Sequence, residues 1–180
     1  MSTDPTPTGR REQRADGTYV VLTRTFRAPI EDVWAAITEP DRLARWIGRW
    51  TGDPEAGTVR FHMLYEGENG EPEEYTIDTC DAPTRLELTS HMAYDASTPA
   101  TWHLELDLAE AGGVTTLTFA QSIPDATMAG SIGPGWEYYL DRLSAARSGR
   151  TPPDFDQHYL DQGPYYAAQA RTAAASLPPT

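Results

Sequence analysis

The chain has 180 residues and a mass of 19.9 kDa, which suits one domain with a substantial core and leaves no room for a second catalytic domain. Its formal net charge is −13, from 27 acidic and 14 basic side chains, and every basic residue is arginine. An acidic chain without a basic cluster is repelled by a phosphate backbone, so we expect no nucleic-acid partner.

The single cysteine, Cys80, excludes an intrachain disulfide and a structural zinc site built on several thiolates. We predict that Cys80 is a small buried residue at a strand end. No stretch approaches the roughly 20 apolar residues that span a bilayer, and residues 1–17 contain no signal-peptide core. These features predict a cytoplasmic protein. The absence of lysine beside many Ala, Gly, Pro and Arg residues suggests a bacterial source with a GC-rich genome.

The first predicted elements are one strand and two short helices. Residues 1–17 are polar and are predicted to form a flexible N-terminal tail. Residues 19–26 are rich in β-branched and aromatic side chains and form a strand that Ala28 and Pro29 end. Pro29 also suits the first turn of an amphipathic helix of about two turns. Pro40 breaks that helix, and a second short helix ends near Gly48.

Five further strands are predicted from alternating apolar and polar side chains. Asn69 and Gly70 have the sequence of a tight hairpin turn, and Gly112 with Gly113 makes another turn. The predicted strands are 59–65, 73–80, 85–90, 100–108 and 114–120.

A long amphipathic helix is predicted to close the domain, from near Gly133 to Gly149. Residues 150–180 contain Pro152 and Pro153 and are predicted to form a C-terminal tail, whose alanine-rich end has the composition of a short helix. The domain therefore spans residues 18–149. Antiparallel strands with helices grouped at both ends predict an α+β fold, in which a twisted six-stranded sheet wraps around the terminal helix.

Four segments together resemble a known family: RTFRAPIEDVWAAITEPDRLARW, GENGEPEEY, TTLTFAQS and GWEYYLDRL. They are similar to the activator of Hsp90 ATPase homologue branch of the START-like, or SRPBCC, superfamily, over roughly residues 18–148. The resemblance implies a helix-grip fold, in which a curved antiparallel sheet surrounds the C-terminal helix and leaves a cavity for an apolar ligand. The chain departs from the family at SIGPG, where a proline between two glycines predicts that the helix starts later or kinks.

Aromatic and apolar side chains fall mainly on the faces that a wrapped sheet turns toward the helix. Core packing explains most of them, and a more specific hypothesis is that some line a pocket for a flat hydrophobic molecule. Tyrosine hydroxyls or Arg24 would then supply the few polar groups that orient the ligand. The predicted ligand-binding residues are Arg24, Trp46, Phe61, Met63, Tyr65, Tyr75, Trp102, Trp136 and Tyr139.

Enzyme and metal signatures are largely missing from the sequence. It contains no G-x-S-x-G elbow, Walker loop, G-x-G-x-x-G after a strand or H-E-x-x-H motif. His62, His91 and His103 lie on different predicted strands without paired ligand spacing. The glutamates around Asn69 fit a solvated turn better than a calcium site, because the EF-hand pattern is missing. We therefore assign no catalytic residue, metal or cofactor.

The leading functional hypothesis is binding of a small hydrophobic ligand, lipid-like or aromatic and polyketide-like. A second hypothesis from the same superfamily is a polyketide cyclase or aromatase-like enzyme, in which Tyr, His or Arg side chains handle protons. A third is an Hsp90-activator-like interaction module. A filled interior would argue against both cavity hypotheses, whereas a broad exposed apolar patch would favour a protein partner. The oligomeric state stays open.

Overall fold

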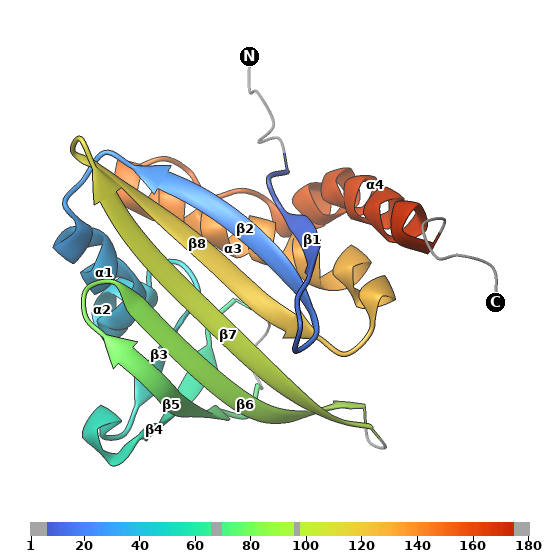
Figure 1. Ribbon diagram of the computed structural model, residues 1–180. Helices are drawn as coiled ribbons and strands as arrows, with labels where there is room; N and C mark the ends of the chain where they lie inside the picture. Colours follow the sequence, from blue (N-terminus) through green and yellow to red (C-terminus); the bar gives the residue numbers. More distant parts are fainter. Residues whose placement is uncertain (1–6, 66–69, 96–97, 175–180) are drawn as a thin grey trace.

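The computed structural model describes residues 7–65, 70–95 and 98–174, and shows one curved antiparallel sheet that packs against the long helix α3 (Figure 1). The strand order is β1-β2-β8-β7-β6-β5-β4-β3. The elements are β1 (Arg10–Gln13), β2 (Thr18–Phe26), α1 (Ile30–Thr38), α2 (Pro40–Leu43), β3 (Gly48–Thr51), η1 (Pro54–Ala56), β4 (Thr58–Met63), β5 (Glu73–Asp81), β6 (Arg85–Asp95), β7 (Thr98–Ala111), β8 (Val114–Ile123), η2 (Ala126–Met128), α3 (Ala129–Ser148) and α4 (Phe155–Ala174).

The predicted α+β class is confirmed, but the described residues form eight strands and not six. β1 lies within the range predicted as an N-terminal tail and pairs with β2, with Arg10 opposite Val21. β3 follows the second short helix and pairs with β4, with Gly48 opposite Met63. Both additional strands have four residues and lie at the sheet edges. Four residues are too few for a clear alternating pattern in the sequence.

The middle of the sheet has the predicted alternation. Leu106 of β7 lies opposite Phe119 of β8, Leu108 lies opposite Leu117, and all four side chains are buried in the core. The predicted hairpin tip at Asn69 falls partly outside the described residues, but β4 and β5 on either side of it pair antiparallel as expected. None of the described helices is long and apolar enough to cross a membrane.

Cys80 is exposed, and the prediction that it is buried was wrong. The residue lies opposite Leu86 near the end of β5. β4 pairs with β5 only as far as Thr76, so the edge of β5 beyond that residue has no neighbouring strand to cover it. Cys80 is therefore on the inward face but at an open part of the sheet.

Helix α3 begins at Ala129, earlier than predicted, and includes Pro134. The short helix η2 leads directly into it, and the Asp125 side chain caps η2 by accepting a hydrogen bond from the Thr127 amide at 2.7 Å. Pro134 removes one helical donor, but its fixed φ is compatible with the helix. The helix ends as predicted, with Gly149 in the left-handed conformation at φ 67°.

Helix α4 occupies much of the range predicted as a C-terminal tail, and it packs against α3 and β1. Its Tyr166 side chain is fully buried. A Cβ atom at Gly133 of α3 would collide with the Tyr166 ring, so the glycine allows the two helices to approach closely. The first glycine of the SIGPG segment thus serves the packing of α4 and does not delay α3.

Candidate functional site

A cavity of about 600 Å³ lies between the inward face of the sheet, the α1–α2 segment and α3. This volume is in the usual range for small-molecule sites. Its lining is mainly apolar and aromatic, with contributions from Trp34, Ile37, Leu43, Trp46, Ile47, Trp50, Val59, Phe61, Met63, Tyr75, Ile77, Leu86, Leu88, Trp102, Leu104, Leu106, Phe119, Ile132, Trp136, Tyr139 and Leu140.

The sequence of α3 helps to explain why this space is not filled. Ile132, Trp136 and Tyr139 line the cavity at helical spacing, but Ser131 and Gly135 on the same side have small side chains or none. A Cβ atom added at Gly135 would meet no other atom within 4 Å. The helix therefore presents two large aromatic rings to the cavity, and Gly135 beside them leaves space that a larger side chain would fill.

Seven of the predicted ligand-binding residues lie together around this cavity. Trp136 is part of the aromatic wall, since its ring packs against Phe119 with ring centroids 4.0 Å apart and against Tyr139 at 6.2 Å. The seven are Trp46, Phe61, Met63, Tyr75, Trp102, Trp136 and Tyr139.

Arg24, which was predicted to orient a ligand, is not among the lining residues. Its guanidinium group pairs with Glu137 at 2.6 Å and with Asp141 at 2.8 Å, both on α3. Burial lowers the pKa of Arg24, but the Asp141 and Glu137 carboxylates outweigh it and raise that pKa above its usual value. Arg24 thus stays charged and holds β2 against α3.

Glu137 is the centre of this second, polar region. It is 1% exposed, and its Oε1 accepts hydrogen bonds from the Thr8 amide at 2.6 Å, the Gly9 amide at 2.8 Å and the Tyr166 hydroxyl at 2.7 Å. Burial and the adjacent Glu137 carboxylate raise the pKa of the Tyr166 hydroxyl far above its usual value, so Tyr166 remains a donor. One carboxylate therefore joins the N-terminal segment, β2, α3 and α4.

Tyr65 is the other predicted residue that does not line the cavity. It is 39% exposed, and its hydroxyl donates to the Ala44 carbonyl at 2.7 Å. The guanidinium of the buried Arg142 lies over the Tyr65 ring, 3.6 Å from its centroid. Tyr65 consequently covers Arg142 from the outside of the molecule.

Several polar residues of the cavity lining were not predicted from the sequence, among them Glu73 and Gln121. Glu73 precedes Tyr75 by two positions on β5, and Gln121 follows Phe119 by two positions on β8. The two-residue period of a strand places each on the inward face, so the alternation contained a signal for both. In the structure the Ser90 hydroxyl donates to Glu73 Oε1, and the Trp136 indole N–H donates to Gln121 Oε1.

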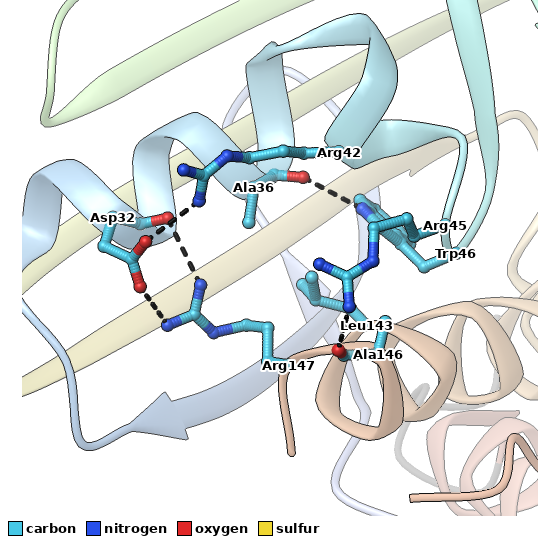
Figure 2. Close-up of a pocket in the computed structure, with 8 residues that line it drawn as sticks. All are labelled: Asp32, Ala36, Arg42, Arg45, Trp46, Leu143, Ala146 and Arg147. Carbon is cyan, nitrogen blue, oxygen red and sulfur yellow. Dashed lines mark hydrogen bonds and ion pairs between the residues drawn. The ribbon is translucent and has the colours of Figure 1, made fainter. Parts of the chain in front are cut away.

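A smaller cavity of about 180 Å³ lies on the other side of Trp46, between α1, α2 and the end of α3 (Figure 2). Asp32 accepts hydrogen bonds there from Arg42 at 2.9 Å and from Arg147 at 2.7 Å. The bonds from Arg147 and Arg42 hold the pKa of Asp32 below its usual value. Trp46 lines both cavities, and its indole donates to the Ala36 carbonyl at 3.0 Å. The arginines here fix the helices that position Trp46.

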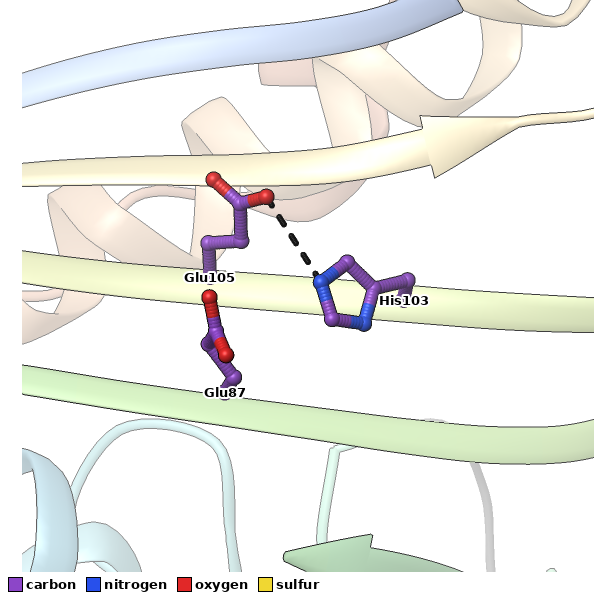
Figure 3. Close-up of side chains that lie close together, drawn as sticks. All are labelled: Glu87, His103 and Glu105. Carbon is purple, nitrogen blue, oxygen red and sulfur yellow. Dashed lines mark ion pairs between the residues drawn. The ribbon is translucent and has the colours of Figure 1, made fainter. Parts of the chain in front are cut away.

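The outward face of the sheet brings together Glu87 of β6 with His103 and Glu105 of β7, whose ligand atoms lie within 4.8 Å of one another (Figure 3). Glu105 already pairs with Arg14 at 2.9 Å. Glu87 accepts from the Thr79 hydroxyl and pairs with Arg85, and these two contacts lower its pKa. Both carboxylates thus have protein partners, and the group is explained as a cross-strand polar cluster.

A family model described as "Activator of Hsp90 ATPase homolog 1-like protein" matches residues 27–147. No curated protein matches the chain. Among solved structures, CalU16 from Micromonospora echinospora is 25% identical with a TM-score of 0.71, over 91% of this chain and 96% of that one. The protein encoded by gene BPP1335 of Bordetella parapertussis is 23% identical with a TM-score of 0.67, over 92% and 93%.

DynU16, a protein in the dynemicin biosynthetic locus, is also similar, with 21% identity and a TM-score of 0.62 over 76% of this chain and 50% of that chain. These likenesses agree with the observed architecture of a curved sheet around a long helix. They extend the agreement beyond the range of the family model, since CalU16 covers nearly the whole chain.

Proposed function

The chain belongs to the activator of Hsp90 ATPase homologue 1-like family, and from this premise we propose that it binds a small hydrophobic molecule in the cavity between the sheet and α3. The cavity itself is the observation that carries the proposal. A space of about 600 Å³ lined by aromatic and aliphatic side chains costs packing energy, so an apolar ligand that filled it would gain both burial and contacts.

Binding without turnover is favoured over a cyclase or aromatase-like reaction. Tyr75 and Tyr139 line the cavity, but no histidine or arginine of the described residues does. The proton-handling side chains that such an enzyme would draw on are therefore limited to tyrosines, carboxylates and the Cys80 thiol.

An Hsp90-activator-like interaction surface has less support. The large exposed apolar side chains of the described residues are Leu64, Tyr65, Phe155 and Tyr165. Tyr65 covers Arg142, and Phe155 packs edge-on against Tyr138 with ring centroids 5.0 Å apart. Tyr165 packs edge-on against Tyr166 with ring centroids 5.1 Å apart, so three of these four residues already have packing partners.

The proposal is tested with two leucine substitutions on the same helix. Gly135→Leu places a side chain into the cavity, whereas Gly130→Leu does not, because Gly130 is outside the lining; a Cβ at either position meets no atom within 4 Å. We expect the wild type and Gly130→Leu to bind the uncharged dye Nile red, and Gly135→Leu to bind it at least tenfold more weakly. Fluorescence titration measures the affinities, and thermal unfolding checks that both variants fold.

Equal Nile red binding by the two variants would place the dye outside the cavity and contradict the proposal. Native mass spectrometry of the protein purified from its own host adds an independent readout, since a retained small molecule would be seen as added mass. The absence of a retained molecule, together with no Nile red binding, would remove the support for a ligand.

A further inference from the structure

The charges around the cavity are of one sign. Among the described residues that line it, the charged ones are Glu39 and Glu73, and none is arginine, lysine or histidine. A ligand carboxylate or phosphate that entered the cavity would therefore find no cation in the described lining to pair with. Inside a low-dielectric cavity such an interaction is much stronger than in water.

The two carboxylates are not equivalent. Glu39 lies at the end of α1, its side chain is 59% exposed, and it pairs with Arg42 at 3.0 Å. Glu73 is partly buried and occupies an inward position of β5, where the next inward residues are Tyr75 and Ile77. An acidic side chain in an otherwise apolar face costs free energy unless hydrogen bonds compensate it. Glu73 is thus the residue whose charge a ligand would sense.

The surroundings of Glu73 supply hydrogen bonds from the protein but leave it beside the cavity. Ser90, which is 1% exposed, donates its hydroxyl to Glu73 Oε1. Ser90 lies opposite Tyr75 on one side and opposite Trp102 on the other, so the pair is embedded among aromatic lining residues. A carboxylate accepts several hydrogen bonds, and a ligand hydroxyl or amine would add one.

Gln121 is a buried polar residue of the lining and is 6% exposed. The indole N–H of Trp136 is a donor, so it must meet the Gln121 oxygen and not the nitrogen. The Gln121 amide NH2 makes no hydrogen bond to another described residue. It offers an uncharged donor, which suits a ligand carbonyl and does not neutralise an anion.

Arg24, the cation that was expected to orient a ligand in the cavity, pairs with other residues. Arg24 pairs with both Glu137 and Asp141 and lies outside the lining. On the opposite side of Trp46, Arg42 and Arg147 pair with Asp32, and Arg45 donates to the Ala146 carbonyl. Arg142 donates to the Trp46 carbonyl at 3.0 Å and lies outside the lining. No described guanidinium is therefore placed to receive a ligand anion in the cavity.

We propose that the cavity selects apolar molecules whose polar group is an uncharged hydroxyl or a protonated amine, donated to Glu73, and rejects molecules that carry a carboxylate or phosphate. This inference rests on the proposed function, because it specifies the class of ligand that the same cavity takes. It excludes fatty acids and phospholipids as ligands and favours neutral or amine-bearing ring systems.

The test uses three probes with one apolar body: 2-(hydroxymethyl)anthracene, 2-(aminomethyl)anthracene and anthracene-2-carboxylate. Their affinities are measured near neutral pH by displacement of Nile red. The alcohol and the amine should bind at least tenfold more tightly than the carboxylate. In Glu73→Gln, which keeps the size of the side chain, the amine should bind more weakly and the carboxylate more tightly. Glu39→Gln is the matched control and should leave the order unchanged.

The possible outcomes distinguish a failure of the charge selection from a failure of ligand binding itself. If Nile red binds in the cavity and the carboxylate displaces it as well as the alcohol does, the charge selection is wrong and ligand binding stands. An unchanged order in Glu73→Gln would likewise overturn the role of Glu73. If Nile red fails to bind the wild type, the proposed function itself fails. If Glu73→Gln does not fold, the relative affinities of the wild type for the three probes still test the charge selection.

Discussion

Helix α3 has two contrasting faces. On one face, Glu137 and Gly133 contact the N-terminal segment and α4, and the space is filled by the Tyr166 ring and a network of hydrogen bonds. On the other face, Gly135 and Trp136 border the cavity of about 600 Å³. The packed face fixes the position of the helix, and this lets the other face stay open without the sheet closing onto it.

Gly133 and Gly135 show the contrast within three residues. A Cβ at Gly133 would collide with Tyr166, whereas a Cβ at Gly135 would meet nothing within 4 Å. The two glycines therefore have opposite physical roles although they flank the same proline. One permits close packing, and the other maintains free volume.

The largest effect is expected from the packed face. Glu137→Ala removes the acceptor of four donors and leaves buried groups without a partner, so we expect a loss of about 3–5 kcal/mol in the free energy of unfolding. Chemical denaturation measures the loss, and the exposed Glu31→Ala serves as the control. A loss below about 1 kcal/mol would mean that this face does not hold α3 in place.

Trp136→Ala tests the open face. A tightly enclosed tryptophan would cost about 3–5 kcal/mol, but Trp136 borders the cavity and is only partly buried, so we expect about 2 kcal/mol. Denaturation of this variant and of Trp136→Phe, which keeps an aromatic ring, gives the comparison. A loss as large as that of Glu137→Ala would show that both faces are equally well packed.

Alanine substitutions at Gly133 and Gly135 compare the packed face and the open face of the same helix. Gly133→Ala gains helix propensity but overpacks against Tyr166, so we expect a net loss of about 1–2 kcal/mol. Gly135→Ala gains the same propensity without a collision and should stabilise the protein by up to about 1 kcal/mol. Thermal unfolding of both variants side by side checks the signs. The same sign for both would refute the assignment of opposite roles.

The smallest effect is expected at Asp32 of α1, which pairs with Arg147 near the end of α3, outside both faces. Hydrogen bonds from Arg147 and Arg42 lower the pKa of Asp32 in the folded protein. Above the unfolded pKa of about 3.8, the charged carboxylate therefore stabilises the folded state. This stabilisation is lost as the pH falls through the lower pKa of the folded state. Asp32 is well exposed, so Asp32→Asn should cost less than about 1 kcal/mol at neutral pH. Denaturation at pH values from neutral down to below the folded pKa should show the two proteins converge. A gap that persisted in acid would point to another cause.

The sequence predicted the parts of the fold that have a local pattern. The alternation around Leu104 and Phe119 predicted two central strands, and Pro40 predicted the break between α1 and α2. The position of α4 had no such pattern, because it depends on Tyr166 meeting Gly133, which lies 33 positions earlier. Contacts of that sequence separation leave no period in the chain.

The candidate site was predictable to a similar degree. The aromatic residues on inward strand faces, such as Phe61, Tyr75 and Trp102, do line the cavity. Arg24 was misplaced because its partners, Glu137 and Asp141, lie on α3, more than a hundred residues away. The four-residue spacing of these two carboxylates on a helix was a signal for an ion pair with a strand cation. Whether aromatic side chains enclose space or fill it depends on the curvature of the sheet, which no single segment specifies.

A shortened form of the protein would lose the hydrogen-bond donors to Glu137. Glu137 lies within residues 27–147, the range of the family match, while Thr8, Gly9, Arg24 and Tyr166 all lie outside it. An expression fragment cut at those limits would keep the carboxylate and lose every one of these donors. During synthesis on the ribosome, likewise, the full set of bonds cannot form until Tyr166 has emerged from the exit tunnel. The folding of this domain is therefore completed by its two ends.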